Sequence, residues 1–107
     1  MILLIQPSTL QDWLKNGACI LIDVREDDEF AAEHIKGAKF HPLSTFPQNF
    51  VSDTYAAHPK IVFQCRSGKR SDTACRIASE LMPHPTGLYN LEGGILAWKE
   101  AGLPTQI

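Results

Sequence analysis

The 107-residue sequence lacks several features that would each point to a particular class of protein. It has no apolar run of about 18 residues or more, which excludes a membrane span. Its three cysteines show no C-x-x-C spacing, which argues against a disulfide framework and against a zinc site. The net charge of −2 gives no overall positive excess for binding nucleic acid. We therefore expect neither a membrane nor a nucleic acid as a partner.

The sequence also lacks internal repeats, low-complexity tracts and linker-like segments. With 44% hydrophobic and 21% charged residues it has an ordinary globular composition, so we expect one domain over residues 1–107. No basic segment precedes the apolar residues 1–5, and Gln6 and Pro7 follow at once, which argues against a signal peptide. An odd number of cysteines suits a reducing compartment, and we expect a cytoplasmic protein.

The most informative stretch covers residues 60–81 and changes its periodicity in the middle. Ile61, Val62 and Phe63 form a short apolar run, which is typical of a strand covered on both faces. Four apolar residues then recur at helical spacing and predict a helix from Ser71: Ala74, Ile77, Ala78 and Leu81. The stretch therefore predicts a buried strand, a tight loop and an amphipathic helix.

Cys65 lies between this strand and this helix, at the start of residues 65–70, which we call the Cys65 loop. Ligands of open α/β sheets bind at the carboxyl ends of strands, and a helix amino terminus favours an anion. The loop also contains the cations Arg66, Lys69 and Arg70. Such surroundings lower a thiol pKa from about 8.5 to about 3.5–7.5. The sequence therefore predicts a thiolate nucleophile in an anion-binding loop.

The rest of the chain alternates between strand-like and helix-like segments. Ser8 and Gln11 match a capping box that would start the first helix at Ser8, and acidic residues open a short helix at 27–33. A last helix would bury Ile95 and Trp98, and segment 44–59 is expected to be irregular apart from a short helix near 45–50. We expect an α/β fold with a mostly parallel five-stranded sheet and helices on both faces. The expected strands are 2–5, 19–24, 37–41, the run at 61–63 and 87–91.

Asp23 and Arg25 follow the second strand, so they lie at the same predicted edge as Cys65. In one interpretation, either side chain supports the rim of the site by hydrogen bonds to loop backbone. In the other, Arg25 forms an ion pair with Glu29 or Glu33 and fixes the short helix. We favour the second interpretation for Arg25 and leave Asp23 undecided.

Several motifs, taken together, resemble those of the rhodanese-like sulfurtransferases. The Cys65-Arg-Ser-Gly-Lys-Arg70 segment is similar to the CxxGxR active-site loop of that family. Asp23-Val-Arg25, His34-Ile-Lys-Gly-Ala38, Leu91-Glu-Gly-Gly-Ile-Leu-Ala-Trp98 and Ala101-Gly-Leu-Pro104 resemble further family motifs in the same order. The resemblance implies a rhodanese fold, with a central parallel five-stranded sheet flanked by helices. It also implies that Cys65 carries a sulfane sulfur.

The length of the Cys65 loop distinguishes sulfur from phosphate chemistry. Related cell-cycle dual-specificity phosphatases place five residues between cysteine and arginine, usually with histidine before the cysteine. Here four residues separate Cys65 from Arg70, and Gln64 precedes the cysteine. The resemblance associates this tighter loop with sulfur. It therefore predicts transfer from thiosulfate, or a related sulfane donor, to cyanide or a thiol through a Cys65 persulfide.

Each residue of the Cys65 loop, together with the adjacent Ser71, receives an expected role in anion binding. Gly68 would allow the tight turn, and Ser67 belongs to the backbone that surrounds the anion. Arg66 and Lys69 would face outward and steer an anionic donor, whereas Arg70 would hold the loop and add positive potential. Ser71 would either cap the helix or hydrogen-bond inside the loop, and we favour the cap.

Rival functions share much of this chemistry. A relay module would accept persulfide sulfur from one protein and pass it to another, and the sequence does not separate it from an enzyme. A phosphatase or arsenate reductase, or a catalytically silent binding module, is favoured less. The proposed mechanism requires no cofactor or metal. Cys75 and Cys19 are interpreted as buried structural thiols, because a bond from Cys75 back to Cys65 would be strained.

Overall fold

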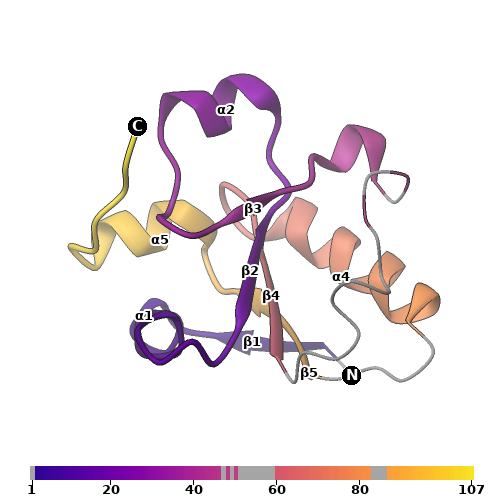
Figure 1. Ribbon diagram of the computed structural model, residues 1–107, viewed down its shortest axis with the longest axis horizontal. Helices are drawn as coiled ribbons and strands as arrows, with labels where there is room; N and C mark the ends of the chain where they lie inside the picture. The colour runs from indigo at the N-terminus through magenta and orange to yellow at the C-terminus, as the bar shows by residue number, and fades with distance from the viewer. Residues whose placement is uncertain (1, 47, 49, 51–59, 83–86) are drawn as a thin grey trace.

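The structure is a computed structural model, and it describes residues 2–46, 48, 50, 60–82 and 87–107. Its centre is a five-stranded sheet in which every paired neighbour is parallel, in the order β1-β5-β4-β2-β3 (Figure 1). This confirms the predicted sheet, and β4 is its middle strand. The strands are β1 (Ile2–Ile5), β2 (Ile20–Asp23), β3 (Lys39–Phe40), β4 (Lys60–Gln64) and β5 (Gly87–Leu91).

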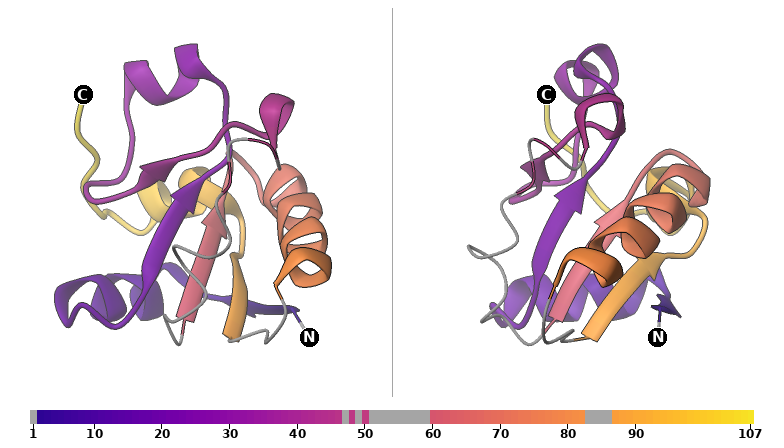
Figure 2. Two further views of the ribbon diagram at one scale, coloured as in Figure 1. Left: turned by 45° about the vertical axis from the view of Figure 1, so that its right-hand side comes forward. Right: turned by 90° about the vertical axis from the view of Figure 1, so that its right-hand side faces the viewer.

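Helices cover both faces of this sheet, as expected for parallel strands. The helix α1 (Pro7–Lys15) and the helix α5 (Gly94–Glu100) pack on one face, and α4 (Lys69–Leu81) packs on the other (Figure 2). The short helix α2 (Asp27–Ala32) lies beyond the carboxyl end of β2 (Figure 1). A 3₁₀ turn, η1 (Leu43–Thr45), follows β3. The carboxyl edge of the sheet is therefore bordered by α2 and by the starts of α4 and α5.

Alternation along β4 sends side chains into two separate cores. Ile61 and Phe63 face α4, whereas Val62 faces α1 and α5, and all three are fully buried. The α4 side holds Ile22, Val24, Phe46, Phe50, Ile61, Phe63, Cys65, Ala74, Cys75, Ala78, Met82 and Leu88. The other side holds Ile5, Leu10, Leu21, Ile35, Val62, Leu91, Ile95 and Trp98. Burial on both faces explains why β4 reads as a continuous apolar run.

The helix ends show where local sequence signals succeed and fail. The predicted capping box is wrong, because α1 begins at Pro7 after Gln6 and has no side-chain cap. Proline suits the first helical position, since it has no N–H to leave unpaired. At the end of α5, Gly102 has φ +79°, and the Leu103 N–H donates to the Trp98 carbonyl at 3.2 Å. The helix therefore ends in a Schellman-type motif, which Gly102 followed by Leu103 and Pro104 is typical of.

Two further expectations need correction. The helix α4 begins at Lys69 rather than Ser71, and Leu81 is 45% exposed, so it does not belong to the buried face. The next residue, Met82, is buried there instead. In the segment predicted to be irregular, the structure places η1 slightly before the expected short helix, and residues 47, 49 and 51–59 lie outside the described part. Among the described helices, none combines the length and apolar character needed to cross a membrane.

Candidate active site

Cys65 follows the last residue of β4, at the carboxyl end of the middle strand. Its side chain is 1% exposed, and its Sγ accepts a hydrogen bond from the Gly68 N–H at 3.0 Å. Gly68 precedes α4 with φ +108°, a conformation that side chains with a Cβ rarely adopt. This confirms the predicted tight turn. The loop thus turns back on itself and directs backbone donors at the sulfur.

The electrostatics of Cys65 reflect competition between burial and hydrogen bonding. Burial acts to raise the pKa of the Cys65 thiol, but hydrogen bonds from the Ser71 hydroxyl and from the backbone of Ser71, Gly68 and Ser67 outweigh it. The pKa of Cys65 therefore lies below its ordinary value. The main cause differs from the expected one, because these hydrogen bonds lower the pKa most, and the Arg70 guanidinium adds a favourable electrostatic interaction with the Cys65 thiolate. Hydrogen bonds from the Cys65 loop and Ser71 stabilise the thiolate.

Ser71 contacts the sulfur rather than capping the helix, so the favoured interpretation is wrong. Gly68 occupies the cap position of α4, and Ser71 lies fully buried in the first turn. Its Oγ lies 3.4 Å from Cys65 Sγ and 2.5 Å from Oδ1 of Asn90. This placement follows from where α4 begins: a start at Lys69 turns Ser71 toward the sheet.

Asn90 is a site neighbour that sequence reasoning missed. It lies in β5 and is 3% exposed, and its Nδ2 donates to the Gly68 carbonyl at 2.9 Å. One signal was present: a polar residue stands at a buried position of an otherwise apolar strand. That residue type needs partners when buried, but the sequence does not show that the partners come from the Cys65 loop.

The start of α5 packs directly against the Cys65 loop. The N–H of Ile95 donates to the Cys65 carbonyl at 2.9 Å, and the N–H of Leu96 donates to the Arg66 carbonyl at 3.2 Å. A Cβ at Gly94 would lie 2.4 Å from both carbonyl oxygens, which is closer than real contacts allow. The absence of a side chain at Gly94 therefore lets α5 approach the Cys65 loop closely.

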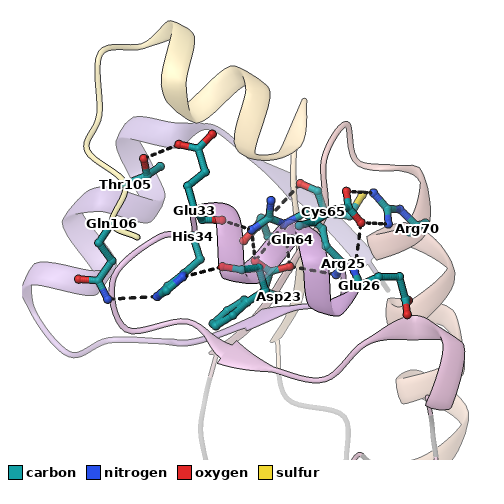
Figure 3. A network of polar contacts seen from close by, with 12 residues as sticks. Asp23, Arg25, Glu26, Glu33, His34, Gln64, Cys65, Arg70, Thr105 and Gln106 are labelled. Atoms are coloured by element: carbon teal, nitrogen blue, oxygen red, sulfur yellow. Dashed lines mark hydrogen bonds and ion pairs between the residues drawn. The ribbon is translucent and has the colours of Figure 1, made fainter.

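The three loop cations occupy two different environments. Arg66 and Lys69 are exposed and form no ion pair within the described part of the chain. Arg70 instead pairs with Glu29 of α2 through two bonds of 2.7 and 2.9 Å (Figure 3). The hydrogen bond from Arg70 is the main reason that the pKa of Glu29 falls to about 2. Arg70 thus ties the loop to α2, and its charge is balanced there.

Asp23 and Arg25 form a buried pair beside the site (Figure 3). Arg25 Nε and Nη2 both donate to the Asp23 carboxylate, with the shortest contact at 2.8 Å. Nη2 also donates to the backbone carbonyl of Glu33 at 2.8 Å. The predicted ion pair of Arg25 with the Glu29 or Glu33 carboxylate is therefore wrong. The pair does fix the end of α2, the helix that carries Glu29.

The other two cysteines have the opposite electrostatics. Cys75 is fully buried, its thiol donates to the Tyr89 carbonyl at 3.4 Å, and burial raises its pKa to about 12. Cys19 is half-buried, and burial raises its pKa to about 11. Both thiols stay protonated at neutral pH, which fits the structural role expected for them. Cys65 is the cysteine whose surroundings favour the thiolate.

Two hollows in the described surface differ in their relation to Cys65. A groove of about 480 Å³ is lined by residues of α1 and α5 and by residues 35–37, and none of the Cys65 loop lines it. A smaller hollow of about 260 Å³ lies between α2 and α5 and is lined in part by Arg25, Glu29 and Arg66. Its lining includes a residue of the loop, so the smaller hollow is the one adjacent to the chemistry.

Comparisons with known proteins agree with this geometry. The family model of the rhodanese-like domain matches residues 6–101. The chain is 42% identical over 101 residues to an uncharacterized protein of Synechocystis sp., covering 94% of this chain and 54% of that protein. It therefore spans about half the length of that relative. It is 28% identical over 102 residues to the thiosulfate sulfurtransferase GlpE of Actinobacillus succinogenes, covering 95% of this chain and 88% of GlpE.

A solved structure gives the same result at the level of the fold. The crystal structure of a rhodanese-related protein from Thermoplasma volcanium matches with a TM-score of 0.80 and 27% sequence identity, over 96% of both chains. The family match and a relative named as a sulfurtransferase support sulfur transfer as the general class of reaction. The match to the family model extends over most of the sequence, and the chain belongs to the rhodanese-like domain family.

Proposed function

We propose that the protein is a sulfurtransferase that moves a sulfane sulfur from thiosulfate, or a related donor, to cyanide or a thiol through a persulfide on Cys65. The observation that carries this proposal is the hydrogen bonding of Cys65 Sγ. Backbone N–H groups and a hydroxyl surround the sulfur, and the pKa of the thiol is lowered despite burial. A thiolate is the reactive form of cysteine, so the site is suited to nucleophilic attack.

In the first half-reaction the Cys65 thiolate attacks the outer sulfur of thiosulfate. A sulfur–sulfur bond forms at Cys65 while the sulfur–sulfur bond of thiosulfate breaks, and sulfite leaves with the electron pair of that bond. The total charge of −3 is the same before and after the step, so no proton or external redox partner is needed. Cys65 becomes a persulfide that carries one negative charge.

The same loop would then stabilise the persulfide anion. The N–H groups that point at Sγ form a concave set of backbone donors, which is a common anion-binding arrangement. In the second half-reaction, cyanide or an acceptor thiolate attacks the outer sulfur. The persulfide bond breaks, and its electron pair returns to Cys65 as the thiolate. Two half-reactions through one covalent intermediate predict ping-pong kinetics.

Three observations support sulfur rather than phosphate as the group that the site transfers. The Cys65 loop has four residues between Cys65 and Arg70, one fewer than the related phosphatases. The arginine that ends the loop is paired with Glu29, so its charge is already balanced. One relative is named a thiosulfate sulfurtransferase. Phosphate release from an aryl phosphate that disappears in Cys65→Ser would overturn this choice.

The donor is proposed to be anionic because two cations of the Cys65 loop, Arg66 and Lys69, are exposed. Neither forms an ion pair within the described residues. Such charges raise the rate of encounter with an anion. Arg66→Ala and Lys69→Ala should therefore slow sulfur transfer from thiosulfate more than transfer from a neutral persulfide donor. Equal losses with both donors would count against steering.

Mass spectrometry tests the proposal directly. After incubation with thiosulfate, the intact protein should gain one sulfur atom, peptide mapping should place it on Cys65, and cyanide should remove it. An adduct on Cys75 would overturn the assignment. Steady-state turnover then separates an enzyme from a relay, since rapid thiosulfate–cyanide turnover supports the enzyme. Efficient transfer from a protein donor alone would assign the relay, with a protein as donor or acceptor.

A further inference from the structure

Asn90 contacts two of the groups that surround the Cys65 sulfur, although it belongs to a different part of the chain. Its Oδ1 lies 2.5 Å from the Ser71 hydroxyl, and its Nδ2 lies 2.9 Å from the Gly68 carbonyl. We infer that Asn90 is a positioning residue for sulfur transfer, whose single amide group holds the Ser71 hydroxyl and the Gly68 turn in place around the sulfur. This inference rests on the proposed function of Cys65.

The amide is anchored on an inner strand of the sheet. Asn90 lies in β5, which is paired on both sides, and it stands in register with Leu4 of β1 and Phe63 of β4. Its side chain is buried and points to the α4 face, where the Cys65 loop and the first turn of α4 meet. A group held by a central strand positions its partners more accurately than a group on a loop.

The chemistry of the two contacts requires an amide. The Gly68 carbonyl accepts from the Asp72 N–H at 3.2 Å and, at the shorter distance of 2.9 Å, from Asn90, so the NH₂ of Asn90 faces Gly68 and its carbonyl oxygen faces Ser71. Gly68 has φ +108° and no Cβ, so its turn has little intrinsic preference for the observed conformation. The bond from Asn90 restrains this flexible residue, whose N–H lies 3.0 Å from Sγ.

The second contact involves one hydrogen and two acceptors. The Ser71 hydroxyl has a single hydrogen, and its oxygen lies 2.5 Å from Asn90 Oδ1 and 3.4 Å from Cys65 Sγ. Asn90 therefore places the hydroxyl next to the sulfur while competing for its hydrogen. Without the amide, neither the Ser71 hydroxyl nor the Gly68 N–H is held at the sulfur, so the thiolate loses the fixed position of both donors. Removal of the amide should therefore disfavour the thiolate.

Site-resolved alkylation with iodoacetamide across pH measures this effect and needs no sulfur donor. In Asn90→Leu the apparent pKa of Cys65 should rise by about one unit, which is about a tenfold slower alkylation below both pKa values. Ser71→Ala should also raise it. The Asn90→Leu/Ser71→Ala double variant should show less than the sum of the two shifts, because the residues act as one unit.

Leu88→Ala is the matched control, because Leu88 lies two positions earlier on the same face of β5 and its apolar side chain cannot hydrogen-bond to the Cys65 loop or to Ser71. It should lower the stability of the protein and leave the Cys65 pKa unchanged.

If Asn90→Leu does not fold, Asn90→Asp replaces it. A carboxylate still accepts from Ser71 but no longer donates to Gly68, and its charge repels the thiolate. We expect that variant to raise the Cys65 pKa by more than about one unit, which slows alkylation by more than about tenfold below both pKa values.

Two results would overturn the inference. One is an unchanged or lowered Cys65 pKa in the Asn90 variants, and the other is a double variant whose shift equals the sum of the single shifts. Failure of the proposed function has a different signature. A wild-type protein that takes no sulfur from thiosulfate would refute sulfur transfer, yet the alkylation shifts would still report whether Asn90 positions the groups around Cys65.

Discussion

Cys65 and Cys75 lie ten residues apart on either side of the start of α4, and both are buried on the same face of the sheet. Burial acts to raise the pKa of each thiol. In Cys75 the Asp72 carboxylate adds to the effect of burial, Arg76 opposes it less strongly, and the pKa rises to about 12. In Cys65 the donors of the loop and Ser71 outweigh burial, and the pKa falls.

This difference shows which feature makes a buried cysteine reactive in this fold. Neither burial nor a nearby cation separates the two thiols, since Arg76 stands next to Cys75 and also acts to lower its pKa. The separating feature is the direction of the surrounding backbone. The N–H groups of Ser67, Gly68 and Ser71 point toward the Cys65 sulfur, whereas the N–H groups around a residue in the middle of a helix are engaged along the helix axis.

The largest expected effect comes from removing each thiol in turn. Cys65→Ser should abolish sulfur uptake from thiosulfate, because no other described thiol is set up to ionise near neutral pH. Cys75→Ala, which keeps the site apolar, should keep uptake within about twofold of wild type. Intact-mass measurement after thiosulfate treatment compares the two variants. Sulfur uptake from thiosulfate by Cys65→Ser would contradict the assignment of Cys65 as the reactive thiol.

Gly94→Ala should have the next largest effect. Its new methyl group would overlap the carbonyl oxygens of Cys65 and Arg66, so α5 or the loop must shift. A displacement of about 1 Å at a reacting group costs about 100-fold in kcat/KM, and the Cys65 pKa should rise toward that of Cys75. Gly17→Ala is the control, because it also has a positive φ, +65°, but an open space around the Cβ. Equal losses in both variants would contradict the contact.

Asp23→Ala should lower the free energy of unfolding and leave the pKa difference between Cys65 and Cys75 largely unchanged. It leaves the Arg25 guanidinium buried without its carboxylate, which costs about 3–5 kcal/mol in the free energy of unfolding. The described side-chain hydrogen bonds of Arg25 go to Asp23 and to the end of α2 and not to the Cys65 loop, so Cys65 should still be alkylated at lower pH than Cys75 in the folded protein. Urea unfolding and alkylation measure the two effects separately. A small loss of stability would contradict the paired arrangement.

Glu29→Gln should have the smallest effect. The pair with Arg70 is partly exposed to solvent, with side-chain exposures of 34% for Arg70 and 26% for Glu29, and such pairs contribute about 1 kcal/mol or less. The pKa of Glu29 is about 2 in the folded protein and about 4.3 in an unfolded chain. Its contribution is therefore complete above about pH 4.3 and is lost as the pH falls through 2.

Unfolding measurements between pH 5 and pH 2 check this prediction. Wild type should lose slightly more stability than Glu29→Gln over this range, and the Cys65 pKa should change little in the variant. A large rise of that pKa would show that the Arg70–Glu29 pair, and not only the hydrogen bonds of the Cys65 loop and Ser71, separates Cys65 from Cys75.

Local sequence signals predicted the frame of the molecule well. The bounds of β1 and β5, the short acidic helix α2 and the glycine end of α5 follow from periodicity and from turn residues. The position of Cys65 at the carboxyl end of the middle strand follows from the change of period within 60–81. These features depend on neighbours within a few residues, which the sequence displays directly.

Partners that come from distant segments were not predictable in the same way. Asn90 reaches Ser71 and Gly68 across about twenty residues of sequence, and Glu29 reaches Arg70 across 41. The wrong assignment of Ser71 has the same origin, because its buried partner, Asn90 Oδ1, lies 19 residues away. The wrong assignment of Arg25 has a different origin, because its partner is the nearby Asp23 carboxylate, which is buried with it at the end of β2.

The pH dependence of alkylation at Cys65 and Cys75, followed by peptide mapping in one sample, tests the central claim most directly. The hydrogen bonds around Cys65 should place its half-maximal rate below that of an ordinary cysteine, near pH 8.5. Cys75 should stay unmodified in the folded protein until the pH approaches 12. Equal profiles for the two thiols, or a Cys65 midpoint above that of an ordinary cysteine, would contradict the account.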